Sequence, residues 1–247
     1  MKHKVTRTQS ALTFIEVLVV IAVLAVLVSL ILPMFAKARQ RSGPPCMGLL
    51  HIIGQAYHVW EADNGGLLPS QQSVSKGGWA DLLTNANQGA ICWTNYAILA
   101  KDLGIWPRSL VCPADERTAA KNFTTDFNNS HVSYFVGVSA SALDPQSILG
   151  GDRNLGLGTK ADPDYGLSPK SGKGNDVAIP ISGPVSWSLK MHSAGNPGGS
   201  GCILLGDGSE RIATTAEMNQ YLTNAPPTTN WPARHVPATP SIRLIFP

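Results

Sequence analysis

The chain has 247 residues, enough for one globular domain and a separate anchoring segment. Its formal net charge at pH 7 is +3, and the basic excess lies in Lys2, Lys4 and Arg7. Removing these three from the 19 basic residues leaves 16, which equals the number of acidic residues. The rest of the chain is therefore neutral, lacks the basic field that holds nucleic acid, and predicts no nucleic-acid partner.

The composition favours a loop-rich domain with β structure, because only 14% of residues are charged and the chain has 24 glycines and 18 prolines. No two of the cysteines have a CxxC spacing, so we predict no zinc site. We also predict no other bound metal and no cofactor. If the domain lies outside the cytoplasm, one or two disulfides are expected, and three pairings are open. The cysteines are Cys46, Cys92, Cys112 and Cys202.

The first predicted element is an apolar helix. Residues 17–36 are interrupted only by Ser29 and Pro33, and a helix of such length spans roughly 30 Å of hydrocarbon. The basic residues ahead of it predict a cytoplasmic N-terminus. An ordinary signal peptide is the alternative, since residues 36–38 read Ala-Lys-Ala, but its apolar core has only about 7–15 residues. Glu16 costs at least about 2.5 kcal/mol inside an apolar span, which a plain signal does not explain.

The stretch Ala11-Leu12-Thr13-Phe14-Ile15-Glu16 resembles the prepilin cleavage motif of type IV pilins and type II secretion pseudopilins. The resemblance implies that residues 1–11 are a leader, that prepilin peptidase cuts between Ala11 and Leu12, and that Leu12 is then methylated. It implies that Glu16 pairs with the N-terminal amine of a neighbouring subunit. Pro33 matches a proline at which such helices bend or melt. Two departures are Ala11 for the usual Gly and Leu12 for the more frequent Phe.

The resemblance implies an α+β, pilin-like fold. A long N-terminal hydrophobic helix over 12–41, for membrane insertion and assembly, would pack with its continuation on a small antiparallel β-sheet with long loops. Two prolines predict a kink or break near 42–45. The protein would be single-pass in the inner membrane, with a periplasmic globular domain, or part of a cell-surface filament. Its partners would be prepilin peptidase, other pilin-like subunits, the inner membrane and the secretion or pilus assembly machinery.

An amphipathic helix is predicted over 46–64, where one apolar stripe faces the sheet: Leu49, Ile52, Ile53, Ala56, Tyr57 and Trp60. Residues 65–225 are predicted to form the globular α+β domain. Its expected strands are 133–138, 186–190, 202–205 and 210–213, the last two joined as a hairpin by Gly206-Asp207-Gly208-Ser209. Short helices are expected over 79–83 and 97–103. Residues 150–184 read as a long surface loop, and the proline-rich tail 226–247 as extended along the surface or partly disordered.

Further segments, among them Asp63-Asn64-Gly65-Gly66 and Cys112-Pro113, are similar to a branch of pilin-like proteins common in planctomycete and verrucomicrobial bacteria. Those proteins carry a histidine, nine residues and then Asp-Gly near the C-terminus. Here fourteen residues separate His192 from Asp207-Gly208, so the spacing departs from that pattern.

No HExxH, GxSxG, phosphate-binding or dinucleotide motif is present, and we predict no catalytic residues and no enzyme activity. Asp162, Asp164 and Asp176 lack the alternating register of a calcium loop. Asp152-Arg153 is interpreted as a structural ion pair, and most of the tryptophans as core residues. The predicted function is a pilin-like structural subunit of a type II secretion pseudopilus or a type IV pilus-like filament. The alternative is a membrane-anchored periplasmic binding protein or enzyme with a pilin-like leader.

Overall fold

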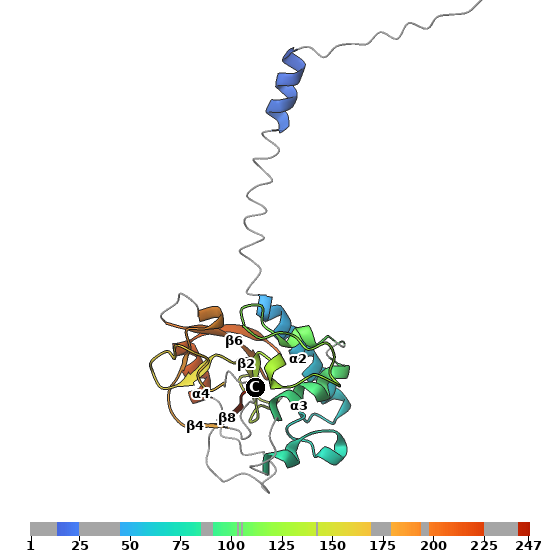
Figure 1. Cartoon of the computed structure of the whole chain (residues 1–247), viewed down its shortest axis with the longest axis vertical. Helices are drawn as coiled ribbons and strands as arrows, with labels where there is room; N and C mark the ends of the chain where they lie inside the picture. The colour runs from blue at the N-terminus through green and yellow to red at the C-terminus, as the bar shows by residue number, and fades with distance from the viewer. Residues whose placement is uncertain are drawn as a thin grey trace, which may run out of the picture. The chain divides into compact units, whose positions relative to one another are not determined.

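The structure is a computed structural model that describes residues 14–24, 45–84, 91–102, 104, 106–141, 143–168, 179–193, 198–224 and 242–247. Its contacts divide the chain into two units, Met1–Gly43 and Pro44–Pro247. Each is described by itself (Figure 1).

In the first unit, residues 14–24 form a helix whose side chains are all exposed. Eleven residues at about 1.5 Å each make a helix of roughly 16 Å, whereas a membrane span needs about 30 Å. In the part of the chain that the structure describes, no helix has both the length and the apolarity to cross a membrane. This finding contradicts the predicted single-pass anchor in the inner membrane with a periplasmic domain. Residues 25–44, with the expected break near 42–45, lie outside the described residues.

The predicted fold class is wrong in two respects. The described N-terminal helix is short where a long hydrophobic helix was expected, and the sheet is large where a small one was expected. Six strands form it in the order β4-β8-β1-β2-β6-β7, and all neighbours are antiparallel. These strands are β1 (Tyr134–Gly137), β2 (Ile148–Asp152), β4 (Ile179–Ile181), β6 (Ser200–Leu205), β7 (Glu210–Thr214) and β8 (Ile242–Ile245).

The other elements cover this sheet or link its strands. A two-stranded antiparallel sheet pairs β3 (Leu155–Leu157) with β5 (Val185–Trp187). The α-helices are α2 (Pro45–Asp63), α3 (Ile91–Ile98) and α4 (Thr215–Asn224). The 3-10 helices are η1 (Val74–Lys76), η2 (Ala80–Thr84), η3 (Leu99–Lys101), η4 (Pro107–Leu110), η5 (Asn129–His131) and η6 (Met191–Ser193).

Both faces of the six-stranded sheet are buried. Successive side chains of a strand point to opposite faces, and here each set belongs to a hydrophobic core. Cys202 and Leu204 of β6 belong to the core under α2 and α3, whereas Ile203 belongs to the core on the side of α4 and β5. Figure 1 shows α2 and α3 on one side of β2 and β6 and α4 on the other. We call these the α2 face and the α4 face.

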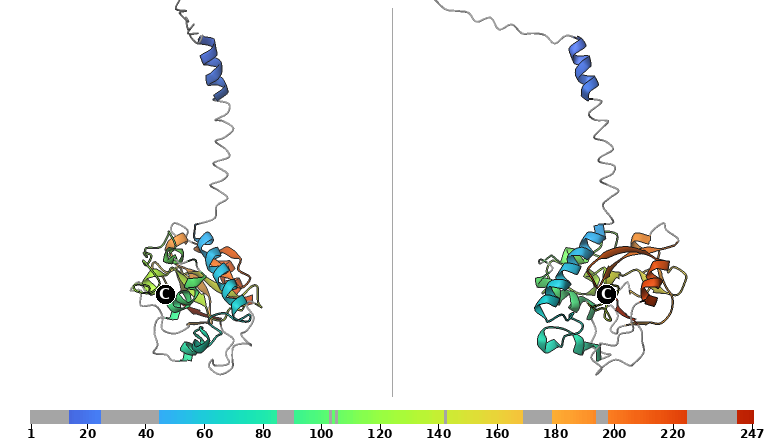
Figure 2. Two further views of the ribbon diagram at one scale, coloured as in Figure 1. Left: turned by 90° about the vertical axis from the view of Figure 1, so that its right-hand side faces the viewer. Right: turned by 180° about the vertical axis from the view of Figure 1, so that it is seen from behind.

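Helix α2 packs against β6 and β7 (Figure 2). The predicted stripe is partly correct, since Ile53, Ala56 and Tyr57 are buried, but Ile52 is exposed. The buried side also includes Cys46, Leu50 and Gly54. Gly54 permits a close approach, because a Cβ there would be 2.9 Å from Leu204 Cδ1.

The hairpin predicted around residues 206–209 is confirmed by the pairing of β6 with β7. The surface loop predicted over 150–184 is wrong, since β2 ends in it, β3 and β4 lie within it, and Asp152–Asn154 are buried. In the proline-rich tail, residues 225–241 are outside the described part, whereas β8 enters the sheet between β4 and β1 with Leu244 and Ile245 fully buried. The predicted surface tail is therefore wrong for residues 242–245, which form an internal strand of the sheet.

The tryptophans divide between core and surface. Trp79 and Trp187 are fully buried, as predicted for most of them, whereas Trp106 is exposed under the Arg108 guanidinium. Trp79 Nε1 donates to Asn95 Oδ1 at 3.0 Å, and Asn95 Nδ2 donates to the Tyr57 hydroxyl at 2.6 Å. This chain of hydrogen bonds joins α3 to α2.

Candidate functional site

Three of the predicted processing and assembly residues, Ala11, Leu12 and Pro33, lie outside the described residues. Glu16 is described, and it is exposed in the helix over 14–24, where it is the only charged residue. The large apolar side chains around it are between 44% and 83% exposed, the extremes being Val17 and Phe14. This helix therefore presents apolar surface on every side.

The predicted C-terminal motif is divided between the two ends of β6. His192 is in η6, before the strand begins, whereas Asp207 and Gly208 form the turn into β7. Asp207 Oδ1 accepts from the Ser209 amide at 2.9 Å. Gly208 has φ +76°, and a Cβ there would be 2.3 Å from His58 Nε2. The turn thus supports α2, and His192 has different neighbours.

Those neighbours form a buried group of thiol, imidazole and carboxylate side chains on the α2 face. One ligand atom from each of four residues lies within 4.8 Å of all the others. Cys46 Sγ and Cys202 Sγ are 2.7 Å apart, and a third sulfur, Cys112 Sγ, is 3.1 Å from His192 Nε2. We call the five residues the thiol cluster: Cys46, Cys112, Asp152, His192 and Cys202.

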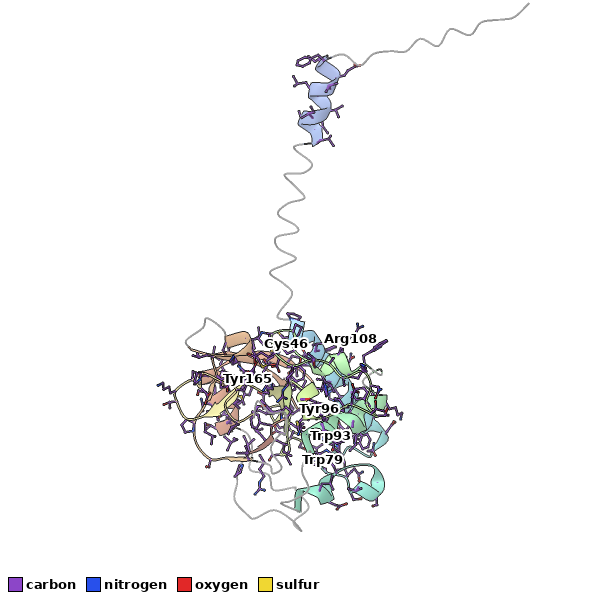
Figure 3. All side chains as sticks on the ribbon, in the orientation of Figure 1. Cys46, Trp79, Trp93, Tyr96, Arg108 and Tyr165 are labelled. Carbon is purple, nitrogen blue, oxygen red and sulfur yellow. The ribbon has the colours of Figure 1, made fainter. Side chains whose placement is uncertain are left out.

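Each member of the thiol cluster comes from a different element. Cys46 is in the first turn of α2, where Figure 3 labels it, and Pro45 precedes it at a position that tolerates proline. Asp152 ends β2, and Cys202 lies on the neighbouring strand β6. Cys112 follows η4.

His192 is positioned by an unusual backbone conformation next to it. Met191 has φ +55°, a left-handed conformation that is uncommon for a residue other than glycine. The tight η6 turn brings His192 Nε2 to 3.8 Å from Asp152 Oδ2. Strain of this kind persists where surrounding contacts demand it and is frequent at functional sites.

Burial has the largest effect on the pKa of Asp152, whereas hydrogen bonds have the largest effect on those of Cys112 and His192. Burial, followed by the proximity of Cys112, raises the pKa of Asp152 to about 7. The hydrogen bond with Cys46, aided by the bond with His192, lowers the pKa of Cys112 to about 5 against the effect of burial. The hydrogen bond with Cys112 and then the nearby Asp152 raise the pKa of His192 despite burial.

Only one of the two carboxylate oxygens of Asp152 has a hydrogen-bond partner among the described residues. Its Oδ2 accepts from the Cys202 amide at 2.7 Å, whereas Oδ1 is buried without a hydrogen-bond partner among the described residues. The predicted ion pair of Asp152 with Arg153 is not formed. Arg153 instead donates to both oxygens of Asp115, at 2.7 and 2.8 Å, and its guanidinium lies 3.4 Å above the Tyr165 ring.

The thiol cluster was missed by sequence reasoning because its members are separated by up to 156 residues. Metal sites on one short loop have a recognisable spacing, but this one is assembled by the sheet and by α2. All four cysteines are free thiols, so neither of the disulfides considered from the sequence is present. Cys92 lies apart from the cluster and donates to the Tyr134 carbonyl at 3.5 Å.

Chemically, the thiol cluster offers soft sulfur and imidazole donors with one carboxylate, a set suited to zinc and similar metals. Four of its five side chains belong to residues that are completely buried, and the His192 side chain is 14% exposed. Comparison of the chain with known protein families, with curated proteins and with solved structures found no match.

Proposed function

We propose that this chain is a pilin-like structural subunit. Prepilin peptidase would cut it between Ala11 and Leu12, and the product would assemble with other pilin-like subunits into a type II secretion pseudopilus or a pilus-like filament. The observation that carries the proposal is the helix over 14–24, whose apolar side chains are exposed on every side and whose only charge is Glu16.

The apolar surface of that helix favours association. Covering one valine, leucine or isoleucine side chain contributes about 1.5–3 kcal/mol, and nine large apolar residues of the helix are exposed. Neighbouring copies of the same helix would supply the missing cover, as in a filament with an apolar helical core.

The charge of Glu16 suits such a core once the leader has been removed. Cleavage would create an amine at Leu12, and an α-amine has a pKa of about 7.7–8, so it is largely cationic near neutral pH. Among packed apolar helices the effective dielectric is low, which strengthens attraction between this amine and the Glu16 carboxylate of a neighbour. Pairing of this kind would set the axial stagger between subunits.

The thiol cluster supports a structural role over a catalytic one. Catalytic metal or nucleophile sites keep a position open for substrate, whereas structural sites are closed. Cys46, Cys112 and Cys202 are completely buried, so their sulfurs do not face solvent. This favours the structural subunit over the alternative of a binding protein or enzyme.

The processing step is tested by the intact mass of the protein purified from its native host. We expect a chain that begins at Leu12 and carries one methyl group. Ala11→Phe should remain uncut, because the peptidase requires a small residue before the scissile bond. A native chain that begins at Arg39, the product of ordinary signal cleavage after Ala38, would overturn the proposal, as would one that keeps residues 1–11.

The assembly step is tested by recovery of sheared filaments. Glu16→Ala should be cleaved normally and yield few or no filaments, and Glu16→Asp should recover part of the yield. Val17→Ala is the matched control on the same helix and should assemble. If Glu16→Ala assembled as well as the unmodified chain, the pairing role would be wrong.

A further inference from the structure

The thiol cluster has the donor composition of a metal coordination sphere and not that of an ordinary hydrophobic core. Cys46, Asp152, His192 and Cys202 direct one donor atom each into a region where all four atoms lie within 4.8 Å of one another. A hydrophobic core gains nothing from gathering a carboxylate, an imidazole and thiols. Binding a cation would convert this costly arrangement into a stabilising one.

The distances are compatible with tetrahedral coordination. With Zn–S bonds of about 2.3 Å, two sulfurs on one zinc ion are about 3.8 Å apart. The Cys46–Cys202 contact of 2.7 Å is shorter than this, and the widest separation allowed by the 4.8 Å limit is longer. Both distances differ from the roughly 3.8 Å expected between two zinc-bound sulfurs by about 1 Å. Rotation of the side chains can remove a difference of this size.

A second observation points to a cation independently of the sulfurs. Asp152 is completely buried, and its Oδ1 has no hydrogen-bond partner among the described residues. A buried acceptor left unpaired costs about 1–3 kcal/mol, and more if it is charged. In the described part of the chain its one ion-pair partner is His192, at 3.8 Å, which helps only when the imidazole is protonated. A divalent cation would satisfy the free oxygen directly.

We propose that the thiol cluster binds one divalent metal ion of the zinc class, with Cys46, Asp152, His192 and Cys202 as ligands. Two thiolates and one carboxylate carry three negative charges, which a dication reduces to one. The two thiol protons leave to solvent on binding, as for any thiolate metal site. Cys112 adjoins His192 Nε2 and lies beside the four ligands.

The metal would have a structural role. It would join the first turn of α2 to β2 and to the η6–β6 region, three parts of the chain that are distant in sequence. Because these ligands are close together only in the folded chain, the binding free energy adds to the free energy of unfolding. The closed site, with no position for substrate, agrees with this role.

The test uses the full chain purified under reducing conditions, with metal content measured by mass spectrometry of the elements and with Zn²⁺ and Co²⁺ titrations. We expect one Zn²⁺ per chain. Co²⁺ should give the charge-transfer bands of sulfur ligands and the intense visible bands of tetrahedral geometry. Cys46→Ser and Cys202→Ser should lower zinc affinity by more than about 100-fold, since even loss of an outer-shell partner costs roughly 10–100-fold.

Cys92→Ser is the matched control, because Cys92 is equally buried but lies outside the thiol cluster. It should keep full stoichiometry. If a cysteine variant fails to fold, Asp152→Asn and His192→Gln test the site through the thermal midpoint. Zn²⁺ should raise the midpoint of the unmodified chain and of Cys92→Ser, and should leave both variants unchanged.

The proposal is overturned if the reduced protein binds no Zn²⁺ or Co²⁺, or if Cys92→Ser loses as much affinity as Cys46→Ser. It is also overturned if the native protein contains a Cys46–Cys202 disulfide, which would remove two of the ligands. None of these outcomes bears on cleavage at Ala11, so the proposed function stands or falls separately.

Discussion

Both faces of the six-stranded sheet are buried, but by different means. On the α4 face, the core consists of large side chains such as Phe135, Trp187 and Phe246. On the α2 face, the core also contains the thiol cluster and the buried Asp115–Arg153 pair. The α4 face is completed mainly by the packing of apolar side chains, whereas the α2 face also holds buried charged and thiol groups whose stability depends on their partners.

The difference between the two faces predicts that substitutions on them will lower the free energy of unfolding for different reasons. Substitutions on the α4 face should act through packing, with effects that do not depend on metal. Substitutions on the α2 face should act through loss of a partner, because a buried charge left alone costs more than the pair contributed.

The largest effect is expected for Asp115→Ala. The side chains of Arg153 and Asp115 are 2% and 0% exposed, so removal of the carboxylate leaves a buried guanidinium without its counter-ion. The free energy of unfolding should fall by about 3–5 kcal/mol, measured by urea denaturation. Glu116→Ala removes the neighbouring exposed pair with Lys190 and should cost no more than about 1 kcal/mol. Equal losses in the two variants would contradict the distinction.

The same pair makes stability depend on pH in acid. Burial opposes ionisation of Asp115, but its hydrogen bonds with Arg153 and the charge of Arg117 lower its pKa below the usual value. A lowered folded pKa contributes stability that is fully present above the unfolded pKa and is lost as the pH falls through the folded pKa, below the usual aspartate range. Asp115→Asn should have a flatter stability profile in this range. An unchanged slope would show that Asp115 is not the group involved.

Features of the fold that depend on residues close together in the sequence could be predicted, and features that depend on distant residues could not. The hairpin of β6 and β7 was found because Asp207-Gly208 forms a turn of recognisable chemistry. The amphipathic period located α2, though its buried side is shifted toward Cys46 and Leu50. Strand β8 was missed because the prolines before it suggested an unpaired tail.

The same dependence on sequence separation holds for Glu16 and for the thiol cluster. Glu16 could be singled out from its neighbours in sequence, because a lone acid in an apolar run is unusual. Cys46 and Cys202 could not be connected, since only the packing of α2 on β6 brings their sulfurs together. Sequence spacing predicts metal sites on single loops and is silent on sites assembled by tertiary structure.

A packing effect on the α4 face is expected for Gly201→Ala. A Cβ at this position would be 2.5 Å from Trp187 Cζ3, so the indole must move within a filled core. Overpacking of this kind costs about 1–3 kcal/mol. The control is Gly48→Ala on the exposed side of α2, where a Cβ meets nothing within 4 Å. It should stabilise by about 0.5–1 kcal/mol. A Gly201→Ala variant as stable as the unmodified chain would mean that Trp187 is loosely held.

The smallest effect is expected at the start of α4, the helix that covers the α4 face of the sheet. Glu217 accepts from the Thr214 amide and hydroxyl at 2.8 Å each, and the Glu217 amide donates back to Thr214 Oγ1 at 3.3 Å. This reciprocal capping box satisfies amides that the first turn leaves unpaired. Thr214→Ala should cost about 1 kcal/mol by urea denaturation, and Thr223→Ala in the last turn should cost less. Thr214→Ser keeps the capping oxygen, so a loss as large as that of Thr214→Ala would locate the effect in the methyl group and not in the cap.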